Sequence, residues 1–399
     1  MDLQAGYPFW LISEGLPFTY PKLQANYHKD VIILGGGISG ALTAHALTEA
    51  GIECAVLDAR SIGLGSTCAS TSLLQYQVDE PLSVLAEKRG MAVAERAYRA
   101  CATSIDLLEA ICKKIRYKEF ARKKTLFFAS YQKDAALINE EYRLHKSAGF
   151  NVQQMTQSEI KELFGFDAPN ALYSNHSAVV NAYSFTHALL QYGRKKGLEI
   201  YDRTKIKDIN HKKRSVELIT EEGYLVSCRK LVYATGYEVV KHIKKHVVDL
   251  ASTYAVISEQ IEPAFQWHED CLIWETKTPY LYIRSTPGNR ILVGGRDEEF
   301  SDPVKRDKLI KHKAALLEND IKKLFPEMPF KPEFRWTGTF GSTKDGLPYI
   351  GTYKPLSNSY FALGFGGNGI TFSAIAAEMI TQQILGNKHP DTDLYKFER

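Results

Sequence analysis

Residues 31–40 read VIILGGGISG, four apolar residues followed at once by a glycine-rich turn. A short, continuous apolar run is typical of a strand that is buried on both faces of a parallel sheet. Residues 41–50 then carry apolar side chains at helical spacing, and Gly51 is a suitable helix C-cap. Because residues 54–57 form another apolar run, the stretch predicts a strand, a turn, a helix and a second strand.

Three glycines of this turn have separate roles in the prediction. Gly35 permits the tight turn, Gly37 lets the backbone approach a pyrophosphate, and Gly40 lets the helix pack closely on the strand. The helix N-terminus presents free N–H groups to phosphates. Asp58, at the end of the second strand, can accept hydrogen bonds from a ribose diol. The stretch therefore predicts a dinucleotide site.

The composition is that of a globular protein, with 44% hydrophobic and 24% charged residues. At 399 residues the chain is too long for one compact core, so we expect two domains. The net charge of +4 is only mildly basic. Basic clusters occur, but no nucleic-acid-binding motif accompanies them, and we expect no nucleic-acid partner.

The six cysteines are scattered and lack the spacing of a metal site. We therefore expect no metal, reduced thiols and a cytoplasmic location. The N-terminus has no basic segment followed by an apolar core, so it does not predict a secretory signal. No stretch approaches the ~18 uninterrupted apolar residues of a membrane span, so we expect no integral membrane segment.

Three downstream segments add to the first unit. Residues 60–75 read RSIGLGSTCASTSLLQ, and such a loop of small residues lets the backbone lie against a large planar ring. Residues 231–237 read LVYATGY, an apolar strand that ends in Ala-Thr-Gly. Residues 360–363 predict a strand that enters a second glycine turn, after which 370–385 has the apolar face of a helix. That helix N-terminus is another site for negative charge.

In this order and separation, the segments resemble the D-amino-acid oxidase-like FAD-dependent oxidoreductases, the group that includes glycine oxidase, sarcosine oxidases and γ-glutamylputrescine oxidase. The segments that carry the resemblance are DVIILGGGISGALTAHAL (30–47), GLGSTCASTSLLQ (63–75), LVYATGYE (231–238), DGLPYIG (345–351) and GFGGNGITFSA (364–374). The resemblance implies FAD as the cofactor.

The resemblance also implies where FAD is held. The first turn and Asp58 would hold the ADP half, the small-residue loop would lie along the flavin, and the second turn would point a helix N-terminus at its pyrimidine edge. The implied cofactor-binding residues are Gly35, Gly37, Ile38, Ser39, Gly40, Asp58, Ala59, Arg60, Gly65, Ser66, Thr67, Ser70, Thr71, Ala234, Thr235, Gly236, Gly366, Gly367, Asn368, Gly369, Ile370 and Thr371.

We expect FAD to be bound without a covalent link. Some relatives attach it through a cysteine shortly before the DGLP-type segment, and residues 336–340 contain none. Attachment at Cys68, within the small-residue loop, is the alternative.

The predicted fold class is α/β (α+β), with a Rossmann-like FAD-binding domain of the glutathione-reductase type interleaved with an antiparallel-sheet substrate domain. Residues 83–114 have helical periodicity, whereas 252–257, 280–284 and 290–295 are typical of strands. We assign segments 1–80, 151–240 and 336–399 to the FAD-binding domain, and 81–150 and 241–335 to the substrate domain.

Candidates for substrate binding come from the predicted strands. Period-two alternation places Tyr280, Tyr282 and Arg284 on one face, and an arginine among tyrosines suits a carboxylate. Amino-acid-oxidising relatives pair such an arginine with an upstream tyrosine, for which Tyr254 is the candidate. Gln75 is a further candidate, because it stands near where sarcosine-type relatives have an arginine. A structural salt bridge is the alternative role of Arg284.

The resemblance implies oxidation of the C–N bond of an amino acid or other amine. Hydride would pass to flavin N5, the imine would be hydrolysed, and electrons would go to O₂ or another acceptor. No catalytic acid or base is assigned. Open alternatives are an FAD-dependent 2-hydroxy-acid or glycerol-phosphate dehydrogenase, a non-catalytic FAD-binding or electron-transfer subunit, and a nicotinamide-only dehydrogenase.

Overall fold

The computed structural model describes residues 1–243 and 245–399, and its first glycine turn lies in a six-stranded sheet. Strand β3 (Val31–Leu34) leads through the turn into helix α2 (Ile38–Glu49) and then strand β4 (Cys54–Leu57), which confirms the predicted unit. Both strands are fully buried, as their continuous apolar sequence requires. The strand order is β19 (Tyr349–Thr352), β20 (Ser359–Leu363), β13 (Lys230–Tyr233), β3, β4 and β9 (Glu199–Tyr201), with β19 alone antiparallel.

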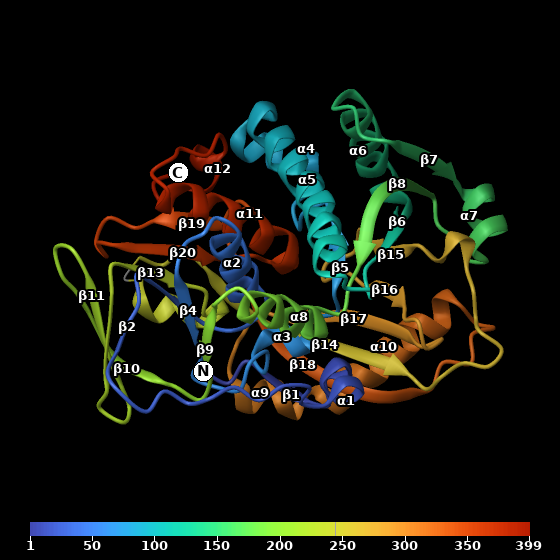
Figure 1. Cartoon of the computed structure of the whole chain (residues 1–399). Coiled ribbons are helices and arrows are strands. Elements are labelled where there is room, and N and C mark those ends of the chain that lie inside the picture. Colours follow the sequence, from blue (N-terminus) through green and yellow to red (C-terminus); the bar gives the residue numbers. More distant parts are fainter. Residues whose placement is uncertain (244) are drawn as a thin grey trace.

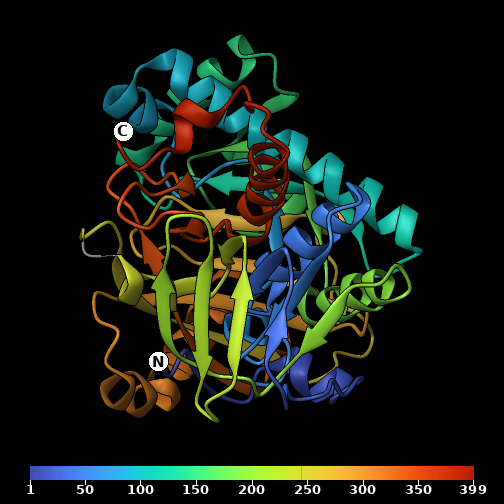
Figure 2. The same cartoon turned by 60° about the vertical axis from the view of Figure 1, so that its left-hand side comes forward.

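The two faces of this sheet are covered differently (Figure 1). On one face, α2 packs against α8 (Ala182–Arg194) and α11 (Gly369–Ile384), and α11 also contacts α5 (Met91–Ile115). On the other face, Ile32 and Leu57 share a core with the four-stranded sheet that comes to the front in Figure 2. Its strands are β10 (Ile206–His211), β11 (Val216–Thr220), β12 (Leu225–Cys228) and β2 (Tyr27–His28).

A ten-stranded, mainly antiparallel sheet forms the second large layer. Helix α10 (Ile310–Leu324) packs on one face of β14, β17 and β18. In order, the strands are β1 (Gln4–Gly6), β18 (Pro332–Ser342), β14 (Asp249–Ser258), β17 (Ile291–Glu298), β16 (Tyr282–Ser285), β15 (Leu272–Glu275), β6 (Ala121–Phe128), β8 (Asn170–Val179) and β5 (Leu73–Gln75), with β7 (Val152–Thr156) also paired to β8. The predicted combination of a parallel nucleotide-binding sheet with an antiparallel sheet is confirmed.

The ten-stranded sheet draws on segments that we assigned to different domains. Strands β7 and β8 come from 151–240, yet β8 pairs along its length with β6 from 81–150. Strand β18 likewise crosses the boundary at residue 335. A strand pattern does not reveal which sheet the strand joins, and the assignment of whole segments to one domain stays a prediction.

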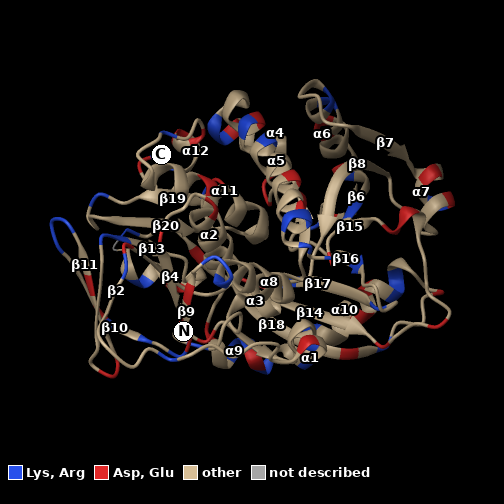
Figure 3. Ribbon diagram, in the orientation of Figure 1, with Lys and Arg blue, Asp and Glu red and all other residues tan. Residues whose placement is uncertain are grey.

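The helices agree with the predicted periodicity except at one break. The helical stretch 83–114 forms two helices, α4 (Leu82–Arg89) and α5, because Gly90 between them has φ of +85°. Figure 3 shows acidic and basic residues interspersed along the ribbon. In the described chain, no helix is long and apolar enough to cross a membrane. The remaining helices are α1 (Phe9–Glu14), α3 (Ser66–Ala69), α6 (Ala135–Ser147), α7 (Gln157–Phe164), α9 (Pro303–Lys308) and α12 (Thr392–Tyr395).

Candidate functional site

A cavity of about 880 Å³ is lined by both glycine turns, by the small-residue loop and by strands of the ten-stranded sheet. This volume is near the upper end of the range of ligand pockets, roughly 300–1,000 Å³. All of the cofactor-binding residues that the resemblance implies line it except Gly40 and Thr371. Of the four substrate candidates, Gln75, Tyr254 and Tyr282 line it.

The first turn brings backbone rather than side chains to the cavity. Gly35 has φ of +103°, and a Cβ there would lie 2.3 Å from the Ala234 carbonyl oxygen, so strand β13 crosses close to the turn. Gly40 faces the other way, since its Cβ would lie 1.8 Å from the Gly35 carbonyl oxygen. Gly40 therefore makes close helix–strand packing possible. Its inclusion among the cofactor-binding residues stays a prediction.

Asp58 anchors the turn at the end of β4. Its carboxylate accepts the N–H of Gly36 at 2.6 Å and that of Arg60 at 2.8 Å. Burial raises the pKa of this carboxyl, whereas the two amides and the nearby Arg60 charge favour the ionised form. The Arg60 guanidinium forms an ion pair with Glu238, a cavity-lining residue that the sequence reasoning missed.

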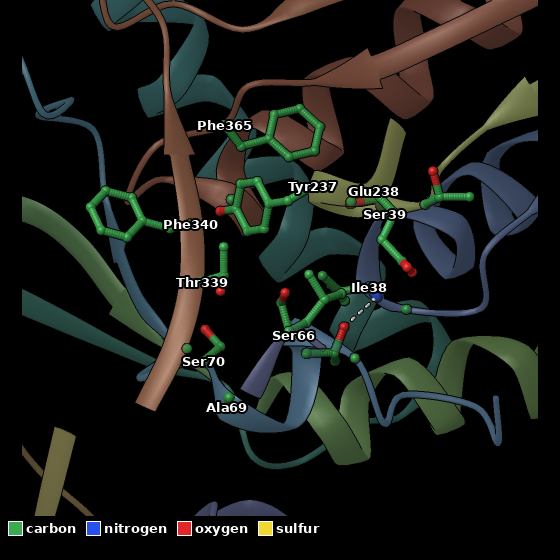
Figure 4. Close-up of a pocket in the computed structure, with 18 of the residues that line it drawn as sticks. Ile38, Ser39, Ser66, Ala69, Ser70, Tyr237, Glu238, Thr339, Phe340 and Phe365 are labelled. Carbon is green, nitrogen blue, oxygen red and sulfur yellow. Dashed lines mark hydrogen bonds between the residues drawn. The ribbon is translucent and has the colours of Figure 1, made fainter. Parts of the chain in front are cut away.

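The small-residue loop lies directly beside the start of α2 at the wall of the cavity (Figure 4). The Ile38 N–H, in the first turn of α2, donates to Thr67 Oγ1 at 3.0 Å. Two other lining hydroxyls, Ser66 Oγ and Thr235 Oγ1, are buried and have no hydrogen-bond partner within the described chain. Buried hydroxyls without partners are uncommon, and here they leave donors and acceptors free for a bound molecule.

Cys68 points away from this cavity. Its side chain is fully buried, and its thiol donates to the Gly65 carbonyl at 3.3 Å. Burial raises the pKa of Cys68 to about 12, so the group is a thiol rather than a nucleophilic thiolate at neutral pH.

The second glycine turn is tied to Asp79. The Asp79 carboxylate accepts the Gly367 N–H at 2.7 Å and the Tyr280 hydroxyl at 3.1 Å. A Cβ on Gly366 would lie 2.1 Å from that carboxylate, so glycine is required there. Nearby, Asn368 Nδ2 donates to the backbone carbonyls of residues 75 and 77.

Thr371 does not line the cavity, and its predicted contact with the cofactor stays a prediction. It is buried within α11, and its hydroxyl donates to the Asn368 carbonyl at 2.9 Å. The helical periodicity of 370–385 did not show which of the first residues would point inward.

Arg284 holds backbone carbonyls together instead of lining the cavity. Its guanidinium donates to the carbonyls of Thr71, Ser72 and Val180 at 3.0–3.3 Å, and to its neighbour Ser285 at 3.0 Å. Burial lowers the pKa of Arg284 to about 10, so it stays charged at neutral pH. Instead of the predicted carboxylate, Arg284 binds the backbone of the small-residue loop and of the end of β8. No local sequence pattern predicts this contact.

The other substrate candidates divide between the two faces of the ten-stranded sheet. Tyr254 borders the cavity, but its hydroxyl donates to the Arg306 carbonyl at 3.3 Å, on the side that α9 covers. Its predicted role as a carboxylate partner is therefore corrected. Tyr282 turns to the cavity side, where its hydroxyl is 3.4 Å from Thr253 Oγ1. Gln75 also lines the cavity, and its Nε2 has no partner in the described chain.

Sequence reasoning missed several polar residues of the cavity, above all Gln77, Asp79 and Asp297. A signal existed for the first two, because Gln75, Gln77 and Asp79 alternate as residues on one face of an extended chain do. Asp297 carried none, since its direction depends on a β-bulge.

Comparison with known proteins agrees with this geometry. The family described as FAD dependent oxidoreductase matches residues 30–383. The chain is 21% identical over 392 residues to the probable oxidoreductase OrdL of Haemophilus influenzae, covering 95% of this chain and 88% of that one. It is 23% identical to the gamma-glutamylputrescine oxidoreductase of Escherichia coli, covering 92% and 86%. The crystal structure of glycine oxidase from Geobacillus kaustophilus aligns with a TM-score of 0.74 at 20% identity, covering 92% and 96%.

The chain therefore belongs to the FAD-dependent oxidoreductase family typified by D-amino-acid oxidase, and it is an FAD-dependent oxidoreductase. The residues present fit that cofactor. The close approach at Gly35, the start of α2 and the unpartnered hydroxyls of Ser66 and Thr235 form one continuous lining suited to a phosphate-bearing molecule.

Proposed function

We propose that this protein oxidises the C–N bond of an amine or amino acid and that it holds FAD non-covalently. The observation that carries the proposal is one cavity with two chemically different ends. One end has the backbone geometry of a dinucleotide site, and the other is lined by tyrosine, tryptophan, glutamine and aspartate side chains. Relatives named for the oxidation of glycine and of gamma-glutamylputrescine support this class of substrate.

Both glycine turns and the small-residue loop would have a role in holding FAD. The start of α2 would stabilise the pyrophosphate through its free N–H groups and its dipole. Asp58 would accept hydrogen bonds from a ribose diol, and the loop around Ser66 would lie along the flavin. Gly366 and Gly367 would bring the turn before α11 close to the ring system.

When bound, FAD supplies a two-electron acceptor for the C–H bond beside the amine nitrogen. The residues of this chain would bind and orient the substrate and exclude water from it. Tyr282 and Gln75 remain candidates for that orientation, because both line the cavity. No residue is assigned to proton transfer.

Non-covalent binding is supported by the position of Cys68. The thiol is fully buried, bonded to the Gly65 carbonyl and outside the cavity lining. It would have to turn and ionise before it could bond to a flavin.

The test is an absorbance spectrum of the purified protein, followed by anaerobic titration. The panel is glycine, sarcosine, proline, putrescine and a γ-glutamyl amine, with lactate and glycerol phosphate for comparison. Bleaching of the flavin bands by an amine supports the proposal. Bleaching by lactate or glycerol phosphate alone would place the protein among the FAD-dependent 2-hydroxy-acid or glycerol-phosphate dehydrogenases. No bleaching by any compound would favour a non-catalytic subunit, and flavin left on acid-precipitated protein would contradict non-covalent binding.

A further inference from the structure

The end of the cavity away from Asp58 carries two carboxylates from distant parts of the chain. Asp79 follows β5, and Asp297 lies near the end of β17. Burial and, to a lesser extent, the charge of Asp79 raise the pKa of Asp297. We call the group of Asp79, Asp297, Trp274, Tyr280 and Tyr282 the acidic end; all five line the cavity.

A β-bulge accounts for the direction of Asp297. Strand β17 pairs with β14 so that Glu298 lies opposite Ser252 and Gly295 lies opposite Tyr254. The two residues between, 296 and 297, therefore face the single residue Thr253. Arg296 takes φ of +59°, and its guanidinium pairs with Asp320. A bulge of this kind redirects the next side chain, and Asp297 turns to the cavity.

Aromatic rings form the wall beside these carboxylates. The Trp274 and Tyr280 ring centres are 5.8 Å apart and those of Tyr280 and Tyr282 are 5.9 Å apart. Trp274 is held by stacking on Phe127 at 3.9 Å. A Cβ on Gly294 would lie 2.2 Å from the Tyr282 ring, so that glycine makes room for the tyrosine. Faces of such rings attract cations.

Buried polar groups at this end are left without partners by the described chain. Gln77 is 5% exposed, and neither its Nε2 nor its Oε1 forms a hydrogen bond. Trp274 is 7% exposed, and its Nε1 is also free. Asp297 Oδ1 is buried and free as well. Because all three residues line the cavity, these groups are available to a bound molecule.

The positive charges of the cavity gather at the opposite end. Arg60 pairs with Glu238, and Lys241 Nζ is 3.7 Å from Glu238. Lys205 and Lys207 follow Thr204, whose N–H donates to the Asp58 carbonyl at 2.7 Å. Among the described residues, these are the arginines and lysines of the lining.

One further lysine influences Asp297 without lining the cavity. Lys313, on α10, pairs with Glu298 and lies 5.4 Å from the Tyr254 ring centre. Its charge is therefore countered on the helix side of the sheet. Two carboxylates with no cation in the lining beside them would repel an acidic substrate.

We propose that the acidic end binds the cationic nitrogen of an amine that has no carboxylate next to it, such as a diamine or polyamine. This inference rests on the proposed function, whose substrate class it narrows from amino acids and amines to cationic amines. Asp79 and Asp297 would supply the countercharge, and the rings of Tyr280, Tyr282 and Trp274 would enclose the cation.

The test is calorimetric titration of the flavin-containing protein, as purified, with two small probes. Tetramethylammonium is a cation whose nitrogen has neither a proton nor a lone pair, so it cannot be oxidised as a neutral amine is. Acetate is the matching anion. We expect saturable binding of tetramethylammonium and none of acetate over the same concentrations. We expect Asp297→Asn and Asp79→Asn each to weaken tetramethylammonium binding by about tenfold. Asp270→Asn, which removes a carboxylate outside the lining, is the control.

The results separate this inference from the proposed function. Acetate binding without tetramethylammonium binding would overturn the inference even if an amino acid bleaches the flavin. Equal binding in the two acidic-end variants and the control would overturn it too. Binding of tetramethylammonium with the expected losses would support it even if no amine in the panel reduces the flavin. Circular dichroism would show whether each variant folds. If a variant does not fold, the titrations of the unaltered protein with tetramethylammonium and acetate test the inference.

Discussion

The two ends of the cavity both contain a carboxylate that accepts a glycine N–H, yet the side chains around the two carboxylates differ in charge. Asp58 accepts from Gly36 and lies near the positive charge of Arg60. Asp79 accepts from Gly367, and its other partner is the neutral hydroxyl of Tyr280. Burial raises the pKa of both carboxyls. The comparison teaches that one backbone motif serves two purposes, which depend on the side chains gathered around it.

The ends also differ in how they are assembled. The Asp58 end comes mostly from one continuous stretch, in which a strand, a turn and a helix place backbone groups. The acidic end combines side chains from β15, β16, β17 and the segment after β5, which meet only when the ten-stranded sheet forms. The Asp58 end therefore depends on local backbone geometry, whereas the acidic end depends on the correct pairing of distant strands.

The largest effect is expected at Gly40, where the Asp58 end depends on close packing. In Gly40→Val the new Cβ would meet the Gly35 carbonyl at 1.8 Å, and a backbone atom cannot move aside cheaply. We expect nearly complete loss of bound flavin, measured as the flavin-to-protein ratio after gel filtration. Gly288→Ala, with open space around the position, should keep its flavin. A Gly40→Val protein with a full complement of flavin would contradict the claim that the Asp58 end depends on close packing at this glycine.

A large effect on stability is expected at Arg284. Arg284→Met leaves the buried carbonyls of Thr71, Ser72 and Val180 without their donor. We expect the free energy of unfolding in urea to fall by about 3 kcal/mol. Arg229→Met, which removes only an exposed contact to Asp30, should change it by less than about 0.5 kcal/mol. Unchanged stability together with lost binding of a carboxylate substrate would restore the role that the sequence suggested.

Asp58→Asn should weaken FAD binding by about tenfold, the equivalent of roughly 1.4 kcal/mol. The amide keeps one acceptor but turns an N–H group toward Gly36 or Arg60, whose own N–H groups need an acceptor. Fluorescence titration of the apoprotein with FAD measures the dissociation constant. Asp30→Asn, at an exposed position, is the matched control. Equal affinity in the two variants would mean that Asp58 does not contact the cofactor.

The smallest expected effect is the pH dependence of cation binding at the acidic end. Burial raises the pKa of Asp297 to about 6, so the carboxylate is lost as the pH falls through that value. Tetramethylammonium affinity should rise roughly fourfold from about pH 5.5 to about pH 7, in proportion to the ionised fraction of Asp297. Calorimetry at several pH values provides the measurement.

Other charged groups around Asp297 set the limits of that dependence. The charge of Asp79 raises the pKa of Asp297, and that of Lys313 lowers it. The Tyr280 and Tyr282 phenols stay neutral, because burial raises the pKa of both. Asp297→Asn should flatten the profile, leaving a smaller slope from Asp79. A profile unchanged by this substitution would assign the titration to another group.

Local sequence was sufficient for much of the fold and for the outline of the first end. The apolar runs at 31–34 and 54–57 are strands because both faces of their sheet are covered. Local sequence did not predict the contacts of Arg284 and Tyr254. Alternation along a strand identifies a face, but Arg284 meets carbonyls of residues 71, 72 and 180, and Tyr254 meets α9, through contacts far apart in the chain.

By itself, the sequence determined that a strand, a glycine turn and a helix follow one another in the geometry typical of a dinucleotide site, because that geometry needs only neighbouring residues and the conformational freedom of glycine. Only the tertiary structure decided what faces the rest of the cavity. The pairing of β14 with β17 forces a bulge that turns Asp297 inward, and the second glycine turn brings Gly367 to Asp79. The physical reason is that a backbone cradle is a local property, whereas the charge of a cavity is the sum of side chains that long-range strand pairing brings together.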